Sequence, residues 1–334
     1  MTEEKGKEMR NRITIQEFAE KTGVSIATIS RAFSGNGRIS PETRKRILEA
    51  AGKYGYSAGT RKLKSECDIP EIVFFYPELY SGEPDYFMAE IIVNIKRHLG
   101  NEHIFTVTPF DENDDHIIDS AKVRMLNGSV AGIIVVAGSP GAEKLAQTAD
   151  SCSVPYVLIG RIPGFEYNTV LHDNEYGAFL AGKYFRETGR RHPVYLSGHL
   201  DAAKRSGFKR GFGGTERIPV VPGGAGFRFG SSALAYIRSH YPETDCVLCA
   251  TDIMAMGLLK EAESQGVRVP EQMAVIGFDD IAVSRFFTPA LSSVSLHLGT
   301  IGRAAADLLE QQLAGKKERP SEVVPCDLVL IKST

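Results

Sequence analysis

Residues 14–32 read TIQEFAEKTGVSIATISRA, and this stretch decides the fold of the N-terminal part of the chain. Thr14 and Glu17 have the spacing of a capping box, in which each side chain hydrogen-bonds the other residue's backbone amide and starts a helix. Gly23 permits a tight turn, and Ser25 can cap a second short helix directly after it. The stretch therefore predicts two short helices joined by a tight turn, which is a helix-turn-helix.

A third helix is predicted after this unit, because Ser40 is a capping residue and Pro41 suits the first helical turn. The inward-facing residues expected of the three helices are Phe18 and Ala19, then Ala27, Ile29 and Ala32 or Phe33, then Ile47, Ala50, Ala51 and Tyr54. We predict a three-helix DNA-binding domain over residues 1–56, since the second helix of such a unit fits the major groove. The alternative is a small structural bundle with a solvated basic face.

The charge of the chain is divided unevenly. Residues 1–64 hold 14 Lys and Arg against 7 Asp and Glu, and the remaining residues hold 25 against 34. The net charge of −2 therefore hides a basic head on an acidic body. A basic head attracts phosphate groups and an acidic body is repelled by them, so this division favours binding of the head to DNA.

Length and composition place the chain among folded proteins with more than one domain. The 334 residues are 43% hydrophobic and 24% charged, which is ordinary for a globular protein. Residues 1–12 are polar and contain no apolar signal-peptide segment, so we expect a cytoplasmic location. The apolar run at residues 132–138 is too short to span a bilayer and reads as a buried strand, so we expect no membrane contact.

Five cysteines, an odd number in a chain of this length, argue against a disulfide framework. Cys246 and Cys249 have the C-x-x-C spacing of a redox or zinc site, but they lie in residues 245–250, which are typical of a core strand. On a strand, residues three apart point to opposite faces, so we interpret these two as apolar fillers. We predict no metal site and no cofactor.

The chain after the head begins with a linker and continues as an alternating fold. Residues 57–70 combine glycine, small residues and basic groups with a closing proline. From residue 71, strands alternating with helices predict a parallel α/β fold. The expected strands are 71–76, 103–108, 132–137, 155–160, 193–197, 217–221, 245–250, 273–277 and 323–331, and the expected helices are 85–99, 113–127, 141–151, 174–188, 201–213, 229–241, 252–265 and 299–314.

This number of strands is too large for one small sheet, so we predict two doubly wound lobes. Lobe 1 should hold about residues 71–168 and 298–320, and lobe 2 about residues 169–297 and 321–334. In such folds ligands bind beyond the carboxyl ends of the strands, which here means the cleft between the lobes. Residues 71–334 are therefore expected to form a core that binds a small molecule.

Several short motifs, each different, occur along the chain. They are Gly23-Val24-Ser25-x-x-Thr28-Ile29-Ser30-Arg31, Ile39-Ser40-x-Glu42-Thr43-Arg44, Gly55-Tyr56, Val154-Pro155, Asp173-Asn174 with Gly177, Arg205-x-Gly207-Phe208, Ala250-x-Asp252-x-Met254-Ala255-x-Gly257 and Val275-x-Gly277-Phe278-Asp279-Asp280. In order and spacing they resemble the lactose-repressor/galactose-repressor (LacI/GalR) family of bacterial transcription regulators over nearly the whole chain. The resemblance implies a core like a periplasmic sugar-binding protein, a homodimer on a near-palindromic DNA operator, and a small effector in the cleft that alters DNA affinity.

The resemblance also assigns DNA-binding residues in the second helix, namely Ser25, Ile26, Ala27, Thr28, Ser30 and Arg31. Arg31 is the candidate for a guanine contact because its fork can reach O6 and N7, while the two apolar residues would touch thymine methyls. The three hydroxyl-bearing residues are expected to bind phosphates and fix the register, although Thr28 and Ser30 could also be solvated surface.

The hinge departs from the family pattern, in which a Pro-Asn pair follows the tyrosine. Here Tyr56 is followed by SAGTRKL, which lacks that pair and is two residues shorter. Leu63 at its end is the candidate for an apolar wedge in the minor groove. A different half-site spacing or DNA bend is therefore expected.

In the cleft, Arg205 and Asp279 are expected to converge from two loops and hold neighbouring ligand hydroxyls through charge-assisted hydrogen bonds. An ion pair within one lobe is the alternative. Tyr80 or Phe87 would stack on a sugar face, with helix core as the alternative for Phe87. The other positions that the resemblance brings to the cleft are Ser139, Arg161, Asp201, Thr251 and Leu298.

Two cleft positions depart from the family pattern. Gly160 stands where several members have an aspartate, and Thr251 stands where an asparagine is frequent. We expect a sugar or sugar derivative as the effector, and a nucleobase or nucleoside is the alternative.

Two further function classes fit parts of the sequence. An enzyme would need a catalytic motif, and the chain has no G-x-x-x-x-G-K loop, no H-E-x-x-H and no G-x-S-x-G; the glycine-rich residues 223–226 lack a following Lys-Ser/Thr. A solute-binding protein would suit the body but not the basic head. We therefore predict a dimeric, operator-specific regulator without enzymatic activity, most simply a repressor. The C-terminal residues 328–334 have no heptad repeat, which argues against a coiled-coil tetramer.

Overall fold

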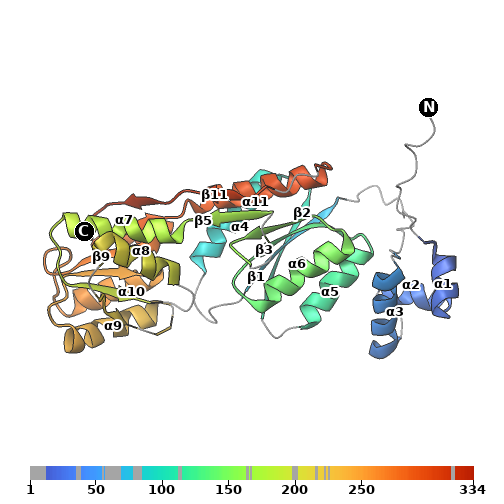
Figure 1. Ribbon diagram of the computed structural model, residues 1–334, viewed down its shortest axis with the longest axis horizontal. Helices are drawn as coiled ribbons and strands as arrows, with labels where there is room; N and C mark the ends of the chain where they lie inside the picture. The colour runs from blue at the N-terminus through green and yellow to red at the C-terminus, as the bar shows by residue number, and fades with distance from the viewer. Residues whose placement is uncertain are drawn as a thin grey trace.

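The computed structural model divides into three parts that follow one another along its long axis (Figure 1). The head lies at one end, lobe 1 is in the middle, and lobe 2 is at the other end with the C-terminus. The residues that the structure describes are 13–34, 39–54, 56, 69–77, 85–111, 115–162, 165, 168–197, 202–214, 217–221, 223–224, 226–316 and 320–334.

The head contains the three expected helices, α1 (Ile15–Thr22), α2 (Ile26–Ser34) and α3 (Pro41–Tyr54). The capping box is confirmed, because the Thr14 amide donates to Glu17 Oε2 at 2.6 Å and the Glu17 amide donates to Thr14 Oγ1 at 3.2 Å. Gly23 ends α1 with a left-handed φ of 65°, which glycine adopts without strain. The turn chemistry that the sequence predicted is therefore the chemistry that forms the helix-turn-helix.

Buried aromatic and aliphatic side chains hold the head together. Phe18 stacks on Tyr56 with ring centroids 4.3 Å apart, and Phe33 meets the same tyrosine edge-on. The expectation that Ala27 faces inward is wrong: Ala27 is exposed, and Ile29, Ala32 and Phe33 bury α2 instead. The head core also includes Ile47, Leu48 and Ala51 of α3, with Val123 and Leu126 of lobe 1 packed against it.

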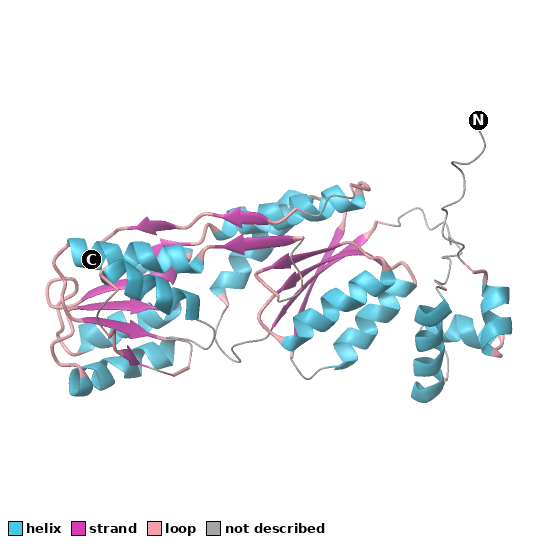
Figure 2. Ribbon diagram, in the orientation of Figure 1, coloured by secondary structure: helices cyan, strands magenta, loops and turns pink. Residues whose placement is uncertain are grey.

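Lobe 1 is a six-stranded parallel sheet, in the order β11-β5-β4-β3-β1-β2, covered by helices on both faces (Figure 2). Its elements are β1 (Glu71–Pro77), α4 (Tyr86–Leu99), β2 (Ile104–Phe110), α5 (Asp115–Leu126), β3 (Val130–Val136), α6 (Pro140–Cys152), β4 (Tyr156–Ile159), β5 (Thr169–His172), α11 (Leu298–Leu313) and β11 (Glu322–Val324). The first five residues of the apolar run, 132–136, belong to β3, whose side chains are buried on both faces as a central parallel strand requires.

Lobe 2 repeats the design with strand order β12-β10-β9-β8-β6-β7. Its elements are α7 (Asn174–Glu187), β6 (Pro193–Leu196), α8 (Ala202–Phe212), β7 (Val220–Val221), α9 (Phe227–His240), β8 (Cys246–Cys249), α10 (Asp252–Ser264), β9 (Ala274–Asp279), the short 3-10 helix η1 (Ala282–Phe286), β10 (Ser292–Ser295) and β12 (Asp327–Val329). All pairs are parallel except β10 with β12. The prediction of two doubly wound lobes is confirmed.

The chain crosses between the lobes three times, and two crossings come later than the sequence suggested. The strands β5 and β11 were expected in lobe 2, but both pair within the sheet of lobe 1. The crossings therefore follow His172, Ser295 and Val324. The sequence missed β5 and β10 because each is only four residues long, β5 is flanked by the polar Asn168 and Asp173, and three of the four residues of β10 are serines.

Glycines let α7 and α8 of lobe 2 pack closely. A Cβ at Gly207 would collide with the backbone carbonyl of Glu175, and a Cβ at Gly211 would collide with that of Phe179. The two helices therefore touch backbone to backbone and form one unit. α7 begins two residues after the first crossing, so this unit is attached directly to the crossing between the two lobes.

The paired cysteines of β8 are core residues, as expected. Cys246 and Cys249 are fully buried and free, and burial raises the pKa of each thiol far above its usual range. Thiolate chemistry needs a lowered pKa, so this pair is inert. Among the described helices, none is long and apolar enough to cross a membrane.

Candidate functional site

The exposed face of α2 is the candidate DNA interface. Ile26, Ala27, Ser30 and Arg31 are all exposed on this helix, and Ile26 keeps 44% of its surface accessible. Residues four apart on a helix lie side by side, so Ala27 and Arg31 form one edge of this face and Ile26 and Ser30 another. An apolar patch beside an arginine is thus presented on a short helix whose opposite side is buried.

Two of the assigned hydroxyls already have partners in the head. Ser25 caps α2 by accepting from the Thr28 amide at 3.2 Å, and its Oγ lies 2.7 Å from Thr28 Oγ1. Their position at a helix N-terminus, where the free amides favour anions, suits a phosphate contact. Arg44 Nε donates to the Ala32 carbonyl at 3.1 Å and fixes α3 against α2. Leu63, the expected wedge, lies outside the described residues.

A cavity of about 450 Å³ lies between the two lobes, at the carboxyl ends of the strands. Its apolar lining comes from Pro77, Phe87, Val136 and Ile159 of lobe 1 and from Ile253, Ile281 and Leu296 on the other side. Its polar lining includes Asp85, Arg161, His172, Asn174, Lys204, Thr251 and Asp279. Apolar walls with a few converging polar groups are typical of a small-molecule site.

The structure brings some of the expected effector-binding residues into this cavity. Phe87, Arg161, Thr251 and Asp279 line it. Ser139 instead caps α6, accepting from the Ala142 amide, and it is 9% exposed. Leu298 is buried at the start of α11, beside a separate hollow. Tyr80 and Asp201 lie outside the described residues.

The expected convergence of Arg205 with Asp279 is not present. Arg205 is exposed on α8 and lines a different hollow, whereas its neighbour Lys204 lines the cleft. Successive residues on a helix are turned by about 100°, so a shift of one position moves a side chain to another face. Lys204 Nζ donates to the Ala250 carbonyl at 2.7 Å, and the sequence reading missed it.

Two carboxyl groups, those of Asp252 and Asp279, lie together on the lobe 2 side of the cleft, and Asp85 of lobe 1 also lines the cleft. Asp252 is fully buried at the start of α10, where its oxygens accept from Ser293 Oγ at 2.6 Å and from the Ile281 amide at 2.8 Å. Asp279 lies beside it at the end of β9. Burial and the nearby Asp85 carboxylate raise the pKa of Asp279 to about 7, against the opposing effect of Lys204. Asp279 is therefore poised between its charged and neutral forms near neutrality.

Two cleft residues that the sequence reading did not assign sit at the first crossing between the lobes. His172 ends β5 and Asn174 begins α7. His172 Nδ1 and Asn174 Oδ1 are buried atoms without a hydrogen-bond partner among the described residues. Burial, with the nearby Lys204 charge, lowers the pKa of His172 to about 4, so the ring is neutral at pH 7. The His-Asp-Asn sequence at a strand end was the signal available for them.

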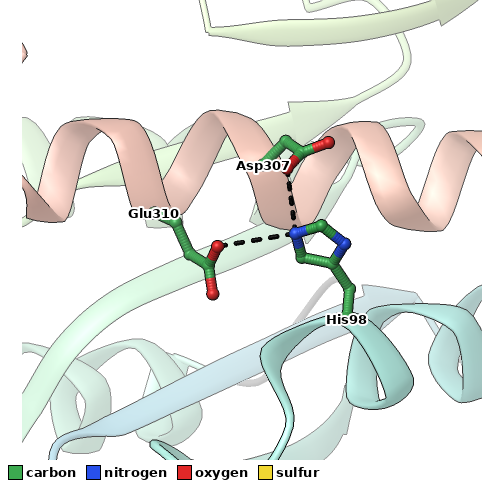
Figure 3. A group of neighbouring side chains, drawn as sticks. All are labelled: His98, Asp307 and Glu310. Carbon is green, nitrogen blue, oxygen red and sulfur yellow. Dashed lines mark ion pairs between the residues drawn. The ribbon is translucent and has the colours of Figure 1, made fainter.

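A group with metal-ligand chemistry lies outside the cleft, between α4 and α11 (Figure 3). His98 Nε2 is 2.9 Å from Asp307 Oδ1 and 3.4 Å from Glu310 Oε2. Both carboxylates point at the same ring nitrogen, and Asp307 is more than half exposed. This geometry is that of an ion pair joining two helices of lobe 1.

Two family models match the chain. The model described as bacterial regulatory proteins, lacI family, matches residues 14–58, and a periplasmic binding protein-like domain matches residues 172–334. The first covers the head and the second covers lobe 2 with the late return through lobe 1. Together they contain the candidate DNA interface and much of the cleft.

Curated relatives are similar over nearly the whole chain. Catabolite control protein A of Priestia megaterium is 30% identical over 90% of this chain and 92% of its own length. The HTH-type transcriptional repressor PurR of Pasteurella multocida is 27% identical over 96% and 98%, respectively. The HTH-type transcriptional repressor CytR of Escherichia coli is 28% identical over 99% and 98%.

Solved structures share the fold. A complex of the transcriptional regulator CelR with cellobiose has a TM-score of 0.70 at 24% identity, covering 97% of this chain and all of that one. The lac repressor dimer bound to operator and the anti-inducer ONPF has a TM-score of 0.68 at 19% identity, covering 97% and 99%. A LacI family regulator from Enterococcus faecium with bound ribose has a TM-score of 0.69 at 18% identity, covering 78% and 98%.

Proposed function

The chain belongs to the LacI family of bacterial regulatory proteins, and we propose that it represses transcription as a homodimer controlled by a carbohydrate in the inter-lobe cleft. As a member of that family it is a DNA-binding transcriptional regulator and not an enzyme. The operator is a near-palindrome, because two identical heads related by a two-fold axis read the same sequence on opposite strands.

The DNA half of the proposal is carried by the exposed face of α2. Arg31 reads a guanine in the major groove, Ile26 and Ala27 contact thymine methyls, and Ser25, Thr28 and Ser30 bind phosphates. The excess of basic residues in the head supplies the salt-dependent part of the affinity. Leu63 is the proposed minor-groove wedge.

The ligand half is carried by one observation, the two buried unpartnered atoms that face the cleft. The burial of His172 Nδ1 and Asn174 Oδ1 destabilises the ligand-free protein, because each atom has lost its hydrogen bonds to water and gained none from the protein. A ligand hydroxyl can donate to either and accept from a third group. Several adjacent hydroxyls therefore suit this lining, with Asp279 and Lys204 supplying charge-assisted bonds.

The remainder of the cleft fits the other side of a sugar. Phe87 and the aliphatic side chains of Ile253 and Ile281 present apolar surface to the C–H faces of a ring. Among the structural neighbours, CelR binds cellobiose and the Enterococcus regulator binds ribose. These complexes support the carbohydrate class for this chain without selecting one sugar.

A ligand that touches both lobes regulates DNA binding only if it binds one arrangement of the lobes more tightly than the other. His172 and Asn174 lie at the first crossing between the lobes, so hydrogen bonds from a ligand to them act on the segment that joins the two lobes. The sign of regulation follows from which lobe arrangement holds the two heads at the operator spacing.

The test uses the full chain in two steps. DNA recovered by selection from a random pool should contain a near-palindrome, and binding to it should weaken steeply with salt. A thermal-shift panel of monosaccharides, disaccharides, sugar acids and nucleosides should give a carbohydrate that stabilises the protein by about 2.7 kcal/mol at a hundred times its dissociation constant. Asp279→Asn should remove that stabilisation and leave operator binding in place.

Three results would count against the proposal. Selected DNA without two-fold symmetry would contradict the proposal that the protein binds its operator as a homodimer. A nucleoside that stabilises the protein when no sugar does would change the ligand class. Carbohydrate binding that survives in both Asp279→Asn and Asn174→Ala would place the ligand outside the cleft.

A further inference from the structure

A second hollow lies on lobe 2, on the face of α8 turned away from the effector cleft. It has a volume of about 770 Å³, within the range of small-molecule pockets. Arg205 and Lys209 line it from α8, and Arg217 lines it from the segment before β7. The partly buried ring of Tyr241 forms part of its wall.

The charges around this hollow are not balanced. Among the residues that the structure describes, no Asp or Glu lines it, and the side chains of Arg205, Lys209 and Arg217 form no ion pair with another described residue. Arg205 and Lys209 are four residues apart on one helix, a spacing at which like charges destabilise the helix by about 0.2–0.5 kcal/mol. These three cations converge on a body that is otherwise acidic, which is the pattern of a site for an anion.

We propose that this hollow, the anion hollow, binds a small phosphorylated metabolite, with Arg205, Lys209 and Arg217 holding the phosphoryl group. The guanidinium groups of the two arginines and the lysine ammonium group can donate hydrogen bonds to the phosphoryl oxygens. The ring of Tyr241 leaves an apolar surface for the organic part of the ligand. Operator DNA is a poor occupant, because lobe 2 lies at the end of the molecule opposite the head (Figure 1).

The anion hollow and the effector cleft share one helix. Lys204 faces the cleft and Arg205 faces the hollow, so a ligand in either place acts on α8. The close contact of Gly207 and Gly211 with α7 makes the two helices move together, and α7 starts at Asn174 in the cleft. We therefore expect an anion to change the affinity for the cleft ligand, a consequence that rests on the proposed function of the cleft.

The direct test measures binding of inorganic pyrophosphate to the full chain by calorimetry, at constant ionic strength maintained with sodium chloride. The expected result is saturable binding that weakens at least tenfold in the double variant Lys209→Glu/Arg217→Glu. The control is Arg228→Glu/Arg238→Glu, which makes the same charge change at two exposed residues of α9 outside the hollow, and it should bind pyrophosphate as the unmodified protein does.

The head is also basic, so each titration is repeated with the heads occupied by excess duplex DNA. Binding that disappears when DNA is present would place the anion on the head and overturn the proposal. Equal binding by the double variant would do the same. A phosphoserine peptide that binds more tightly than pyrophosphate or glucose 6-phosphate would overturn the free-metabolite assignment.

Failure of this proposal is distinguishable from failure of the proposed function. The pyrophosphate titration needs neither the operator nor the cleft ligand, and Asp279→Asn leaves the anion hollow intact. With a carbohydrate in hand, coupling is measured as the ratio of its dissociation constants with and without saturating pyrophosphate. A ratio of one would show that the two sites are not coupled through α8. The existence of the anion hollow is decided separately, by the pyrophosphate titration.

Discussion

Lys204 Nζ lies 3.8 Å from the centroid of the Phe278 ring, and Phe278 directly precedes Asp279 in the chain. The ammonium group is held there by the aromatic face and by the Ala250 carbonyl, to which it donates at 2.7 Å. A cation fixed beside a carboxyl at the end of β9 gives the cleft its polarity. The sequence pointed to the neighbouring arginine for this role.

Lys204→Met should weaken binding of the cleft ligand by about ten- to a hundredfold, because a hydrogen bond to a charged group contributes about 1.5–3 kcal/mol. The measurement is a calorimetric titration with the ligand found in the thermal-shift panel. Lys183→Met, which removes an exposed cation from α7, is the matched control. Loss of binding in Arg205→Met but not in Lys204→Met would restore the assignment made from the sequence.

The stability of the ligand-free protein should respond to pH through two cleft residues with opposite signs. The pKa of Asp279 is raised from 3.8 to about 7, so the folded state holds a proton that the unfolded state has released, and stability falls as pH rises from about 4 to 7. The pKa of His172 is lowered from 6.5 to about 4, so stability rises over about pH 4 to 6.5. The two contributions largely cancel up to about pH 6.5.

Single variants should separate these contributions, each amounting to at most about 1.4 kcal/mol per pH unit. Relative to the unmodified protein, Asp279→Asn should gain stability as pH rises from 4 to 7, and His172→Gln should lose it from 4 to 6.5. Denaturant unfolding at half-unit pH intervals checks both. Parallel curves for all three proteins would show that neither residue titrates abnormally.

Gly207→Ala should destabilise lobe 2 by about 1–3 kcal/mol, because the new Cβ would collide with the Glu175 carbonyl across the α7–α8 contact. Ser206→Ala is the control, since it changes an exposed neighbour on the same helix and should alter stability by no more than about 0.5 kcal/mol. Thermal unfolding of the two variants gives the comparison. An unchanged melting temperature in Gly207→Ala would mean that the helices do not pack at this distance.

Arg31→Ala should cost about 1–3 kcal/mol of operator affinity and relax specificity at one base pair in each half-site. The reason is that a bidentate contact to guanine is lost while the phosphate contacts stay. Binding to a set of single-base operator variants measures it, with Lys53→Ala in α3 as a control for removal of a head charge. Uniform weakening on every operator variant would show that Arg31 contacts phosphate instead.

The parts of the fold that could be read from the sequence are those fixed by neighbours along the chain. The Thr14–Glu17 capping box, the turn at Gly23 and the apolar β3 are local features whose residues lie within a few positions of each other, and the structure contains all three. The short β5 carries too little local signal, because only its pairing with β4 and β11 makes it a strand.

The sequence by itself determined a basic three-helix head and a two-lobed α/β core with a cleft, because periodicity, capping and charge are properties of the chain. Only the tertiary structure decided which cation of α8 lines the cleft. Lys204 and Arg205 are adjacent cations in the sequence, but packing of Gly207 against α7 fixes the rotation of α8, so the two side chains line different hollows. The tertiary structure also buries His172 Nδ1 and Asn174 Oδ1 without a hydrogen-bond partner among the described residues, since burial is set by elements far apart in the chain.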